Sequence, residues 1–315
     1  MTLAVLLAAA LSAAAAPASA PAAPHGPTLA GDALELKTVD GWTIHAIWLK
    51  ALEGKPTLIL LHGTGQRKED WRPFARALSR AGDGYVAVDL RGHGESRVSP
   101  SGETVSYKKL RVSAKGANDY EDMTRDIEAA VAALTTQGVV EESIGLLGAE
   151  VGGSVAIKYA AVHPKVPFVI MLSPGLDTQE IPIVNAMRAF KGRTTPILMV
   201  HSEADKRSAR DTPLLFAFAK NSVGERNATL IVVPQERGTR VLKANKGLTE
   251  RILAWVVDPH PPAVEASTAA ATGVSADTSA AVSPSGEGAD SEAEPEAEPA
   301  NPAPAPAPSR DGDAL

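Results

Sequence analysis

The chain has 315 residues, a formal net charge of −6 and no cysteine. The lack of cysteine excludes disulfides, thiolate metal sites, a cysteine nucleophile and a cysteine-linked lipid anchor. Residues 261–315 hold ten acidic residues and one arginine, a net of −9, which leaves +3 for the rest of the chain. So small a positive charge does not predict a surface that binds nucleic acid.

Composition divides the chain into three parts. Residues 1–20 form an apolar, Ala- and Leu-rich run followed by small residues, which predicts a signal peptide and export to the periplasm or the exterior. No Lys or Arg precedes the run, so an Ala-rich leader is the alternative, and Pro17 argues against a stable membrane span. Residues 259–315, rich in Pro, Ala and acid, predict a disordered tail whose partner is unknown. Residues 27–258 suit one α/β domain.

Within that domain, strand patterns alternate with helix patterns. Alternating runs at 33–39 and 43–50 flank Asp40-Gly41 and predict an antiparallel hairpin at a sheet edge. Continuous apolar runs, typical of strands covered on both faces, follow at 57–61, 85–88, 143–147, 168–172, 196–200 and 229–233. Helical periodicity is found at 69–80, from 119 onward, and at 154–161, 183–190, 211–220 and 248–257.

The alternation of these elements predicts the fold class. Repeated strand–helix–strand order gives an α/β fold with a mostly parallel, doubly wound sheet of about eight strands. Too few residues separate Leu172 from Pro196 for a separate lid domain. The polar stretch at 97–119 predicts a long surface loop, which in a compact domain is more often functional than not.

A glycine-flanked turn lies between the strand at 143–147 and the helix at 154–161. Residues 148–152 read Gly-Ala-Glu-Val-Gly, which has the glycines of the nucleophile elbow G-x-S-x-G. Glu150 stands where that pattern places serine. The spacing therefore predicts the architecture of the elbow but not its usual chemistry.

Four segments, each after a predicted strand, carry a resemblance to a known family. They are His-Gly-Thr-Gly at 62–65, Asp-Leu-Arg-Gly-His-Gly-Glu-Ser at 89–96, the turn at 148–152 and Leu-Ser-Pro-Gly at 172–175. From about residue 34 to 257 the chain resembles the α/β-hydrolase superfamily, in particular lidless bacterial members similar to dienelactone hydrolases and serine aminopeptidases. The resemblance implies an α/β-hydrolase fold and a hydrolase of esters or amides that uses Ser, Asp and His in that chain order.

The resemblance also implies which residues would occupy the active site. The two backbone N–H groups of the oxyanion hole would come from Val151 and Thr64. The acid position falls on Asp205, the nucleophile position on Glu150 and the histidine position on Arg237. The triad therefore reads Glu150, Asp205, Arg237, with two of its three members replaced.

These replacements predict impaired catalysis. A serine nucleophile needs a base that takes up and returns a proton near neutral pH, and arginine stays protonated in proteins. We expect a hydrolase-fold protein that has lost serine hydrolase chemistry and serves as a binding or structural homologue; a small acyl or ester compound in the pocket above Glu150 is the candidate ligand. Two alternatives remain: an active hydrolase of esters or small acyl compounds that uses Glu150 or another base such as His201, and a scaffold that acts through the tail.

Charge complementarity predicts how the three positions are arranged. Glu150, Arg237 and Asp205 would form an ion-paired chain, since a lone buried carboxylate is costly. No spacing of His, Asp and Glu predicts a metal site, and no cofactor is expected. The glycines at 148–153 match a phosphate-binding loop, but Ser154 stands where that loop requires lysine, which argues against nucleotide binding.

Overall fold

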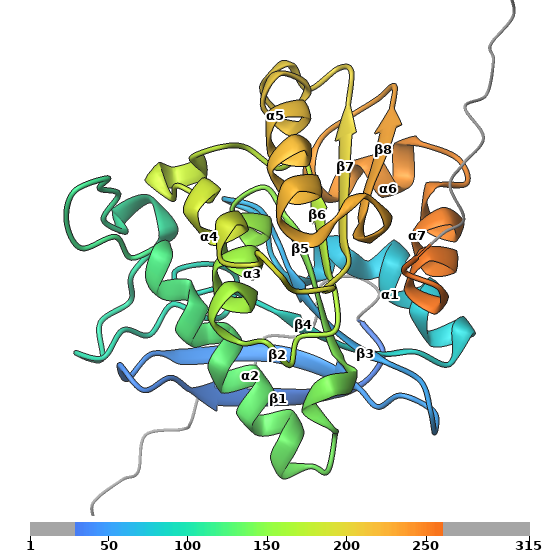
Figure 1. Ribbon diagram of the computed structural model, residues 1–315. Coiled ribbons are helices and arrows are strands. Elements are labelled where there is room, and N and C mark those ends of the chain that lie inside the picture. The colour runs from blue at the N-terminus through green and yellow to red at the C-terminus, as the bar shows by residue number, and fades with distance from the viewer. Residues whose placement is uncertain (1–28, 261–315) are drawn as a thin grey trace, which may run out of the picture. The chain divides into compact units, whose positions relative to one another are not determined.

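The computed structural model describes residues 29–260 (Figure 1). The predicted signal peptide and nearly all of the predicted tail lie outside the described residues, as do the first residues of the expected 27–258 domain. Export, the signal peptide and the role of the tail therefore stay predictions.

The strands form one sheet. They are β1 (Asp32–Lys37), β2 (Thr43–Leu49), β3 (Thr57–Leu61), β4 (Gly84–Val88), β5 (Ile144–Ala149), β6 (Val169–Leu172), β7 (Ile197–Ser202) and β8 (Ala228–Val233). Their order is β1-β2-β4-β3-β5-β6-β7-β8. β2 pairs antiparallel with both β1 and β4, and all other neighbours are parallel. The predicted edge hairpin and mostly parallel sheet are confirmed.

Helices cover both faces of this sheet. They are α1 (Arg72–Ala81), α2 (Thr124–Thr136), α3 (Val151–Val162), α4 (Val184–Arg188), α5 (Lys206–Val223), α6 (Val241–Ala244) and α7 (Leu248–Val257). Short 3-10 turns lie at Lys68–Trp71, Tyr107–Lys109, Glu121–Met123, Glu141–Ser143, Thr178–Glu180, Glu225–Asn227 and Gly238–Arg240.

The side chains that alternate along the strands build two separate cores. One core packs α2, α3, α4 and α5 against one face of the sheet. The other packs α1, α6 and α7 against the opposite face (Figure 1). This is the doubly wound arrangement expected when parallel strands read as continuous apolar runs.

Two elements differ from the sequence-based prediction at their N-terminal ends. The helix expected from residue 119 becomes a 3-10 turn followed by α2 at Thr124. The helix expected from residue 211 begins earlier, at Lys206, because the side chain of Asp205 accepts a hydrogen bond from the backbone N–H of Ser208 and caps it.

No separate lid covers the sheet within residues 29–260. The segment between β6 and β7 holds only a 3-10 turn and the five-residue helix α4. In the same range, no helix has both the length and the apolarity needed to cross a membrane.

Buried ion pairs fix the loop that follows β4. Lys68 donates from its backbone N–H and from Nζ to the Asp89 carboxylate, at 2.8 and 2.7 Å. Arg91, which lies two residues after Asp89, forms ion pairs with Asp126 and with Asp40, each at 2.7 Å. Breaking one partner of a buried pair leaves an uncompensated charge, so these contacts hold the 89–96 segment in place.

The turn between β5 and α3 depends on close backbone contacts. A Cβ atom added at Gly148 would lie 2.2 Å from the carbonyl oxygen of Gly152, and one at Gly152 would lie 2.3 Å from the carbonyl oxygen of Leu61. Both obstacles are backbone atoms of packed elements, which cannot move aside. Glycine is therefore required at both positions to bring the start of α3 against β3.

We expect Gly152→Ala to lower the free energy of unfolding by about 3 kcal/mol, because the added methyl group overlaps the backbone of β3. Urea denaturation followed by circular dichroism measures the change. Gly116→Ala is the control, since a Cβ there lies 3.4 Å from its nearest neighbour, an ordinary contact distance. Equal effects of the two substitutions would contradict the steric argument.

Candidate active site

Glu150 occupies the strained position of the turn between β5 and α3. Its backbone has φ 49° and ψ −115°, a conformation that non-glycine residues rarely adopt. Its N–H donates to the carbonyl oxygen of Leu172 at 2.8 Å. The turn therefore presents residue 150 beyond the carboxyl ends of the parallel strands, where open α/β sheets place their ligands.

The Glu150 carboxylate pairs with Arg237. Glu150 Oε1 lies 3.2 Å from Arg237 Nε, and the two side chains are 18% and 61% exposed. Because arginine faces solvent, the pair stabilises the fold by only about 0–1 kcal/mol. The predicted contact between the nucleophile and histidine positions is present, as an ion pair.

Asp205 is not the third member of an ion-paired chain. Ser208 Oγ donates to Asp205 Oδ2 at 2.9 Å, and the Ser208 backbone N–H donates to Oδ1 at 3.4 Å. Within the described residues, the ion pair that Arg237 forms is with Glu150. The predicted ion-paired series of Glu150, Arg237 and Asp205 is therefore wrong for Asp205, because the Asp205 carboxylate caps the N-terminus of α5.

Burial raises the pKa of the Glu150 carboxyl group above its ordinary value. The charge of Arg237 lowers the pKa and that of Asp205 raises it, with smaller lowering effects from Arg240 and Arg207. The net direction is upward, since the partial burial and the second carboxylate outweigh the exposed arginines. Glu150 is thus easier to protonate than a glutamate in water.

Two glycines make room for the Glu150 carboxylate. A Cβ atom at Gly63 would lie 2.3 Å from Glu150 Oε2, and one at Gly238 would lie 3.3 Å from Glu150 Cδ. The carboxylate therefore lies between the loop after β3 and the loop after β8. It is beside Thr64, one of the two predicted oxyanion-hole residues.

The two predicted oxyanion-hole donors come from different segments of the chain. Val151 is the first residue of α3 and Thr64 follows Gly63. In residues 29–260, the structure records no acceptor for the backbone N–H of either residue. Two such N–H groups are what stabilises a negatively charged oxygen in acyl transfer.

Side chains that sequence reasoning missed tie the site loops together. Gln66 Oε1 accepts from the Gly63 N–H at 2.9 Å, and Gln66 Nε2 donates to Thr239 Oγ1 at 3.1 Å. Gln179 Nε2 donates to Thr64 Oγ1 at 3.1 Å from a backbone with φ 54°. These amides join loops far apart in the chain, and nothing in the local sequence marks them.

Ser173 connects two loops near the site. Its backbone has φ 52°, and its hydroxyl accepts a hydrogen bond from the Gly238 N–H at 2.9 Å. The turn after β6 is thereby linked to the loop that carries Arg237.

The histidines near the strand ends have no recorded contact with Glu150 in residues 29–260. His62 Nδ1 donates to the Gly63 carbonyl oxygen at 2.8 Å, and its Nε2 accepts from the Leu90 N–H at 3.1 Å. Burial lowers the pKa of His62 and lowers that of His93 to about 3. His201 is buried at the end of β7, and its Nδ1 has no partner among the described residues. None of the three forms a recorded hydrogen bond or ion pair with Glu150 in residues 29–260.

A pocket of about 730 Å³ lies beside the ion pair. It is lined by charged and polar side chains, among them Asp205, Lys206, Arg207, Arg237 and Arg240. Glu150 is not part of this lining, so Arg237 stands between the pocket and the carboxylate. Within residues 29–260, no group of three His, Asp or Glu side chains is arranged to hold a metal ion.

Comparison with known proteins identifies the family. A family model described as serine aminopeptidase, S33, matches residues 53–231. The chain belongs to this family. That match, the sheet order and the elbow together confirm the resemblance to α/β hydrolases.

The curated relatives of this S33 family member are esterases of greater length. Protein phosphatase methylesterase 1 of Mus musculus is 32% identical over 131 residues, and that of Bos taurus is 33% identical over 129 residues. Each match covers 41% of this chain and 30% of the relative. The chain thus aligns with less than a third of the relatives' length.

Solved structures with the same fold are also hydrolases. An esterase of Pyrococcus furiosus has a TM-score of 0.56 at 17% identity and covers 73% of this chain and 92% of its own. A dienelactone hydrolase of Anabaena variabilis has a TM-score of 0.54 at 17% identity, covering 72% and 96%. At this identity the likeness shows the fold alone.

The raised pKa of Glu150 predicts a pH-dependent stability. A carboxyl group with a raised folded-state pKa adds most stability below its unfolded pKa, and that contribution is lost as the pH rises through the folded pKa. Glu150→Gln removes the titration. The variant should therefore gain stability relative to the native protein between pH 5 and pH 8, measured by urea denaturation at each pH.

The control for this experiment is Glu53→Gln, at an exposed position between β2 and β3. It should change the free energy of unfolding by less than about 0.5 kcal/mol at either pH. If the free energies of unfolding of Glu150→Gln and the native protein differ by the same amount at pH 5 and at pH 8, the raised pKa of Glu150 is contradicted.

The contact between Gly63 and the Glu150 carboxylate predicts energetic coupling. Gly63→Ala should destabilise the native protein more than it destabilises the Glu150→Ser variant, because serine leaves the space free. We expect a coupling energy of about 1 kcal/mol in a double-mutant cycle measured by urea denaturation. If the effects of Gly63→Ala and Glu150→Ser on the free energy of unfolding are additive, the Glu150 carboxylate does not lie against Gly63.

Proposed function

We propose that this protein is an S33-family α/β hydrolase homologue without serine hydrolase chemistry, which binds a small acyl compound at the pocket beside Arg237. The observation that carries the proposal is the 3.2 Å ion pair between Glu150 and Arg237. It occupies the two positions at which the family's mechanism needs a hydroxyl and an imidazole.

The chemistry of the pair supports impaired catalysis. Hydrolysis through a covalent intermediate requires a nucleophile and a base that moves a proton twice. Arg237 is a permanent donor and cannot accept that proton. Glu150 is engaged by the arginine and lies between two loops, so neither group supplies the missing step.

The pocket supports an acyl ligand with an acceptor group. Arg207 and Arg240 line the pocket together with Arg237 and pair with Asp177 and Glu236, at 3.0 and 2.9 Å. Guanidinium groups bind carboxylates and ester carbonyls through directed N–H donors. The curated relatives are named methylesterases, which favours an ester or its acid as the ligand class.

An active hydrolase is the second candidate, and two observations favour it. The strained backbone of Glu150 is retained, and such strain is often kept at catalytic positions. His201 Nδ1 is buried without a partner among residues 29–260, so an unused imidazole lies on the strand that leads to Asp205. In this alternative Glu150 attacks the acyl group and a second base activates water.

The test is turnover of p-nitrophenyl butyrate by the purified full chain. The native protein should show no rate above that of buffer with an inert protein. Glu150→Ser combined with Arg237→His should hydrolyse the ester at least about tenfold faster than either single variant, because a base contributes strongly only beside a nucleophile.

The single variants Glu150→Ser and Arg237→His are the matched controls, each checked for folding by circular dichroism. Turnover by the native protein that Glu150→Gln abolishes would overturn the proposal in favour of the active hydrolase. A rate lost on His201→Gln would identify the second base.

A further inference from the structure

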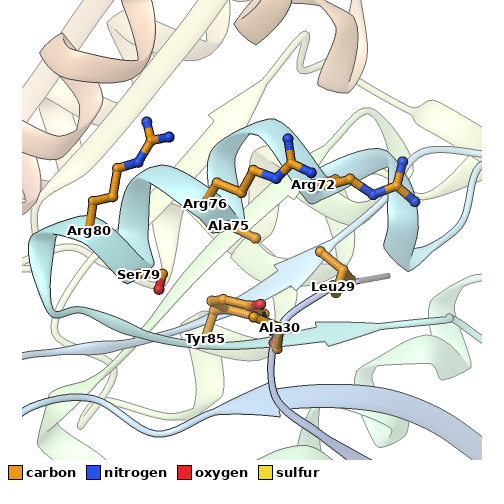
Figure 2. Close-up of a pocket in the computed structure, with 8 residues that line it drawn as sticks. All are labelled: Leu29, Ala30, Arg72, Ala75, Arg76, Ser79, Arg80 and Tyr85. Atoms are coloured by element: carbon orange, nitrogen blue, oxygen red, sulfur yellow. Dashed lines mark hydrogen bonds between the residues drawn. The ribbon is translucent and has the colours of Figure 1, made fainter. Parts of the chain in front are cut away.

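A second pocket lies on the face of the sheet that carries α1. It has a volume of about 220 Å³ and lies between α1, the start of the described chain at Leu29 and Ala30, and Tyr85 of β4 (Figure 2). Its lining shares no residue with the candidate active site. Pockets for drug-sized ligands are about 300–1,000 Å³, so this one suits a smaller molecule.

Three arginines of α1 line this pocket. Arg72, Arg76 and Arg80 follow one another at intervals of four residues, so they lie along one side of the helix (Figure 2). Like charges at this spacing destabilise a helix. Arg76 and Arg80 are exposed and Arg72 is partly buried, so the row is a local concentration of positive charge that attracts an anion.

No carboxylate of the described residues pairs with these three guanidinium groups. Elsewhere in the same range, Arg91, Arg111 and Arg125 each contact an aspartate within 3 Å. The Nε atom of Arg72 is buried and has no hydrogen-bond partner. A buried N–H without an acceptor is costly, and a bound anion would satisfy it.

The floor of the pocket is apolar. Leu29 and Ala75 are 7% and 1% exposed and belong to the core beneath α1. Tyr85, which is 1% exposed, donates from its hydroxyl to the carbonyl oxygen of Ala30 and closes the bottom of the pocket. An apolar floor below a row of guanidinium groups matches a molecule with one charged end and one apolar end.

We propose that this pocket binds a small amphiphilic anion, with a phosphate or carboxylate headgroup on a short alkyl chain. The headgroup accepts hydrogen bonds from Arg72 and Arg76, whose forked donors fit two oxygens of such a group. The exposed hydroxyl of Ser79, on the same side of α1, is a further donor. The alkyl chain lies over Leu29 and the Tyr85 ring.

The experiment is isothermal titration of the full chain with four probes: hexyl phosphate, hexanoate, inorganic phosphate and hexanol. We expect saturable binding of hexyl phosphate, hexanoate or both, weaker binding of inorganic phosphate and none of hexanol. The two anionic arms identify the headgroup. The difference between hexyl phosphate and inorganic phosphate measures the contribution of the apolar floor.

Variants locate the binding. Arg72→Gln and Arg76→Gln should each weaken the binding of the better anion by about tenfold or more, the effect of losing a charge-assisted hydrogen bond. Arg226→Gln is the matched control, an exposed arginine in the turn before β8, and should leave the affinity unchanged. Circular dichroism melting confirms that each variant is folded.

Three results would overturn the proposal. They are no saturable binding of either alkyl anion, affinities unaffected by Arg72→Gln and Arg76→Gln, and equal affinities for hexyl phosphate and inorganic phosphate. The second of these results, combined with loss of binding in Arg237→Gln, would assign the anion to the pocket beside Glu150. The outcome does not depend on whether the protein hydrolyses esters.

Discussion

The close approach of the start of α3 to the backbone of β3 is the constraint on which the rest of the structure depends. Gly148 and Gly152 permit it, and it forces residue 150 into a left-handed backbone beyond the ends of the parallel strands. This geometry is set by backbone contacts and does not require a particular side chain at position 150. The elbow can therefore persist while its chemistry changes, which is why fold and activity must be argued separately here.

The electrostatics of the site follow from that position. A carboxylate placed on the turn is partly removed from water, so its pKa rises and an opposite charge nearby becomes favourable. Arg237 supplies the charge from the loop after β8, while Asp205, at the family's acid position, is used to cap α5. Amides and a hydroxyl at Gln66, Gln179 and Ser173 hold the surrounding loops. These hydrogen bonds connect the loops around the Glu150–Arg237 ion pair.

The sequence predicted the features that depend on local pattern. Strand runs, the edge hairpin and the elbow could be read because periodicity and glycine spacing act over a few residues. The resemblance to α/β hydrolases implied the positions of Glu150 and Arg237, and the structure brings these two side chains together. Features that depend on distant contacts could not be read: Gln179 meets Thr64 across 115 residues, and the ion-paired chain failed because a local cap competed for Asp205. The pocket beside α1 was not predicted either, because Leu29 and Tyr85 line it together with the arginines of α1.

The exposure of Arg237 bears on what the pair is for. A pair whose arginine is 61% exposed adds little to stability, so stability alone does not account for it. Its larger effect is geometric, because the guanidinium lines the pocket while the carboxylate lies behind it, beside Gly63. Under the proposed function, an acyl ligand contacts the arginine donors that line the pocket. The Glu150 carboxylate repels a negatively charged ligand from the loop that carries Thr64.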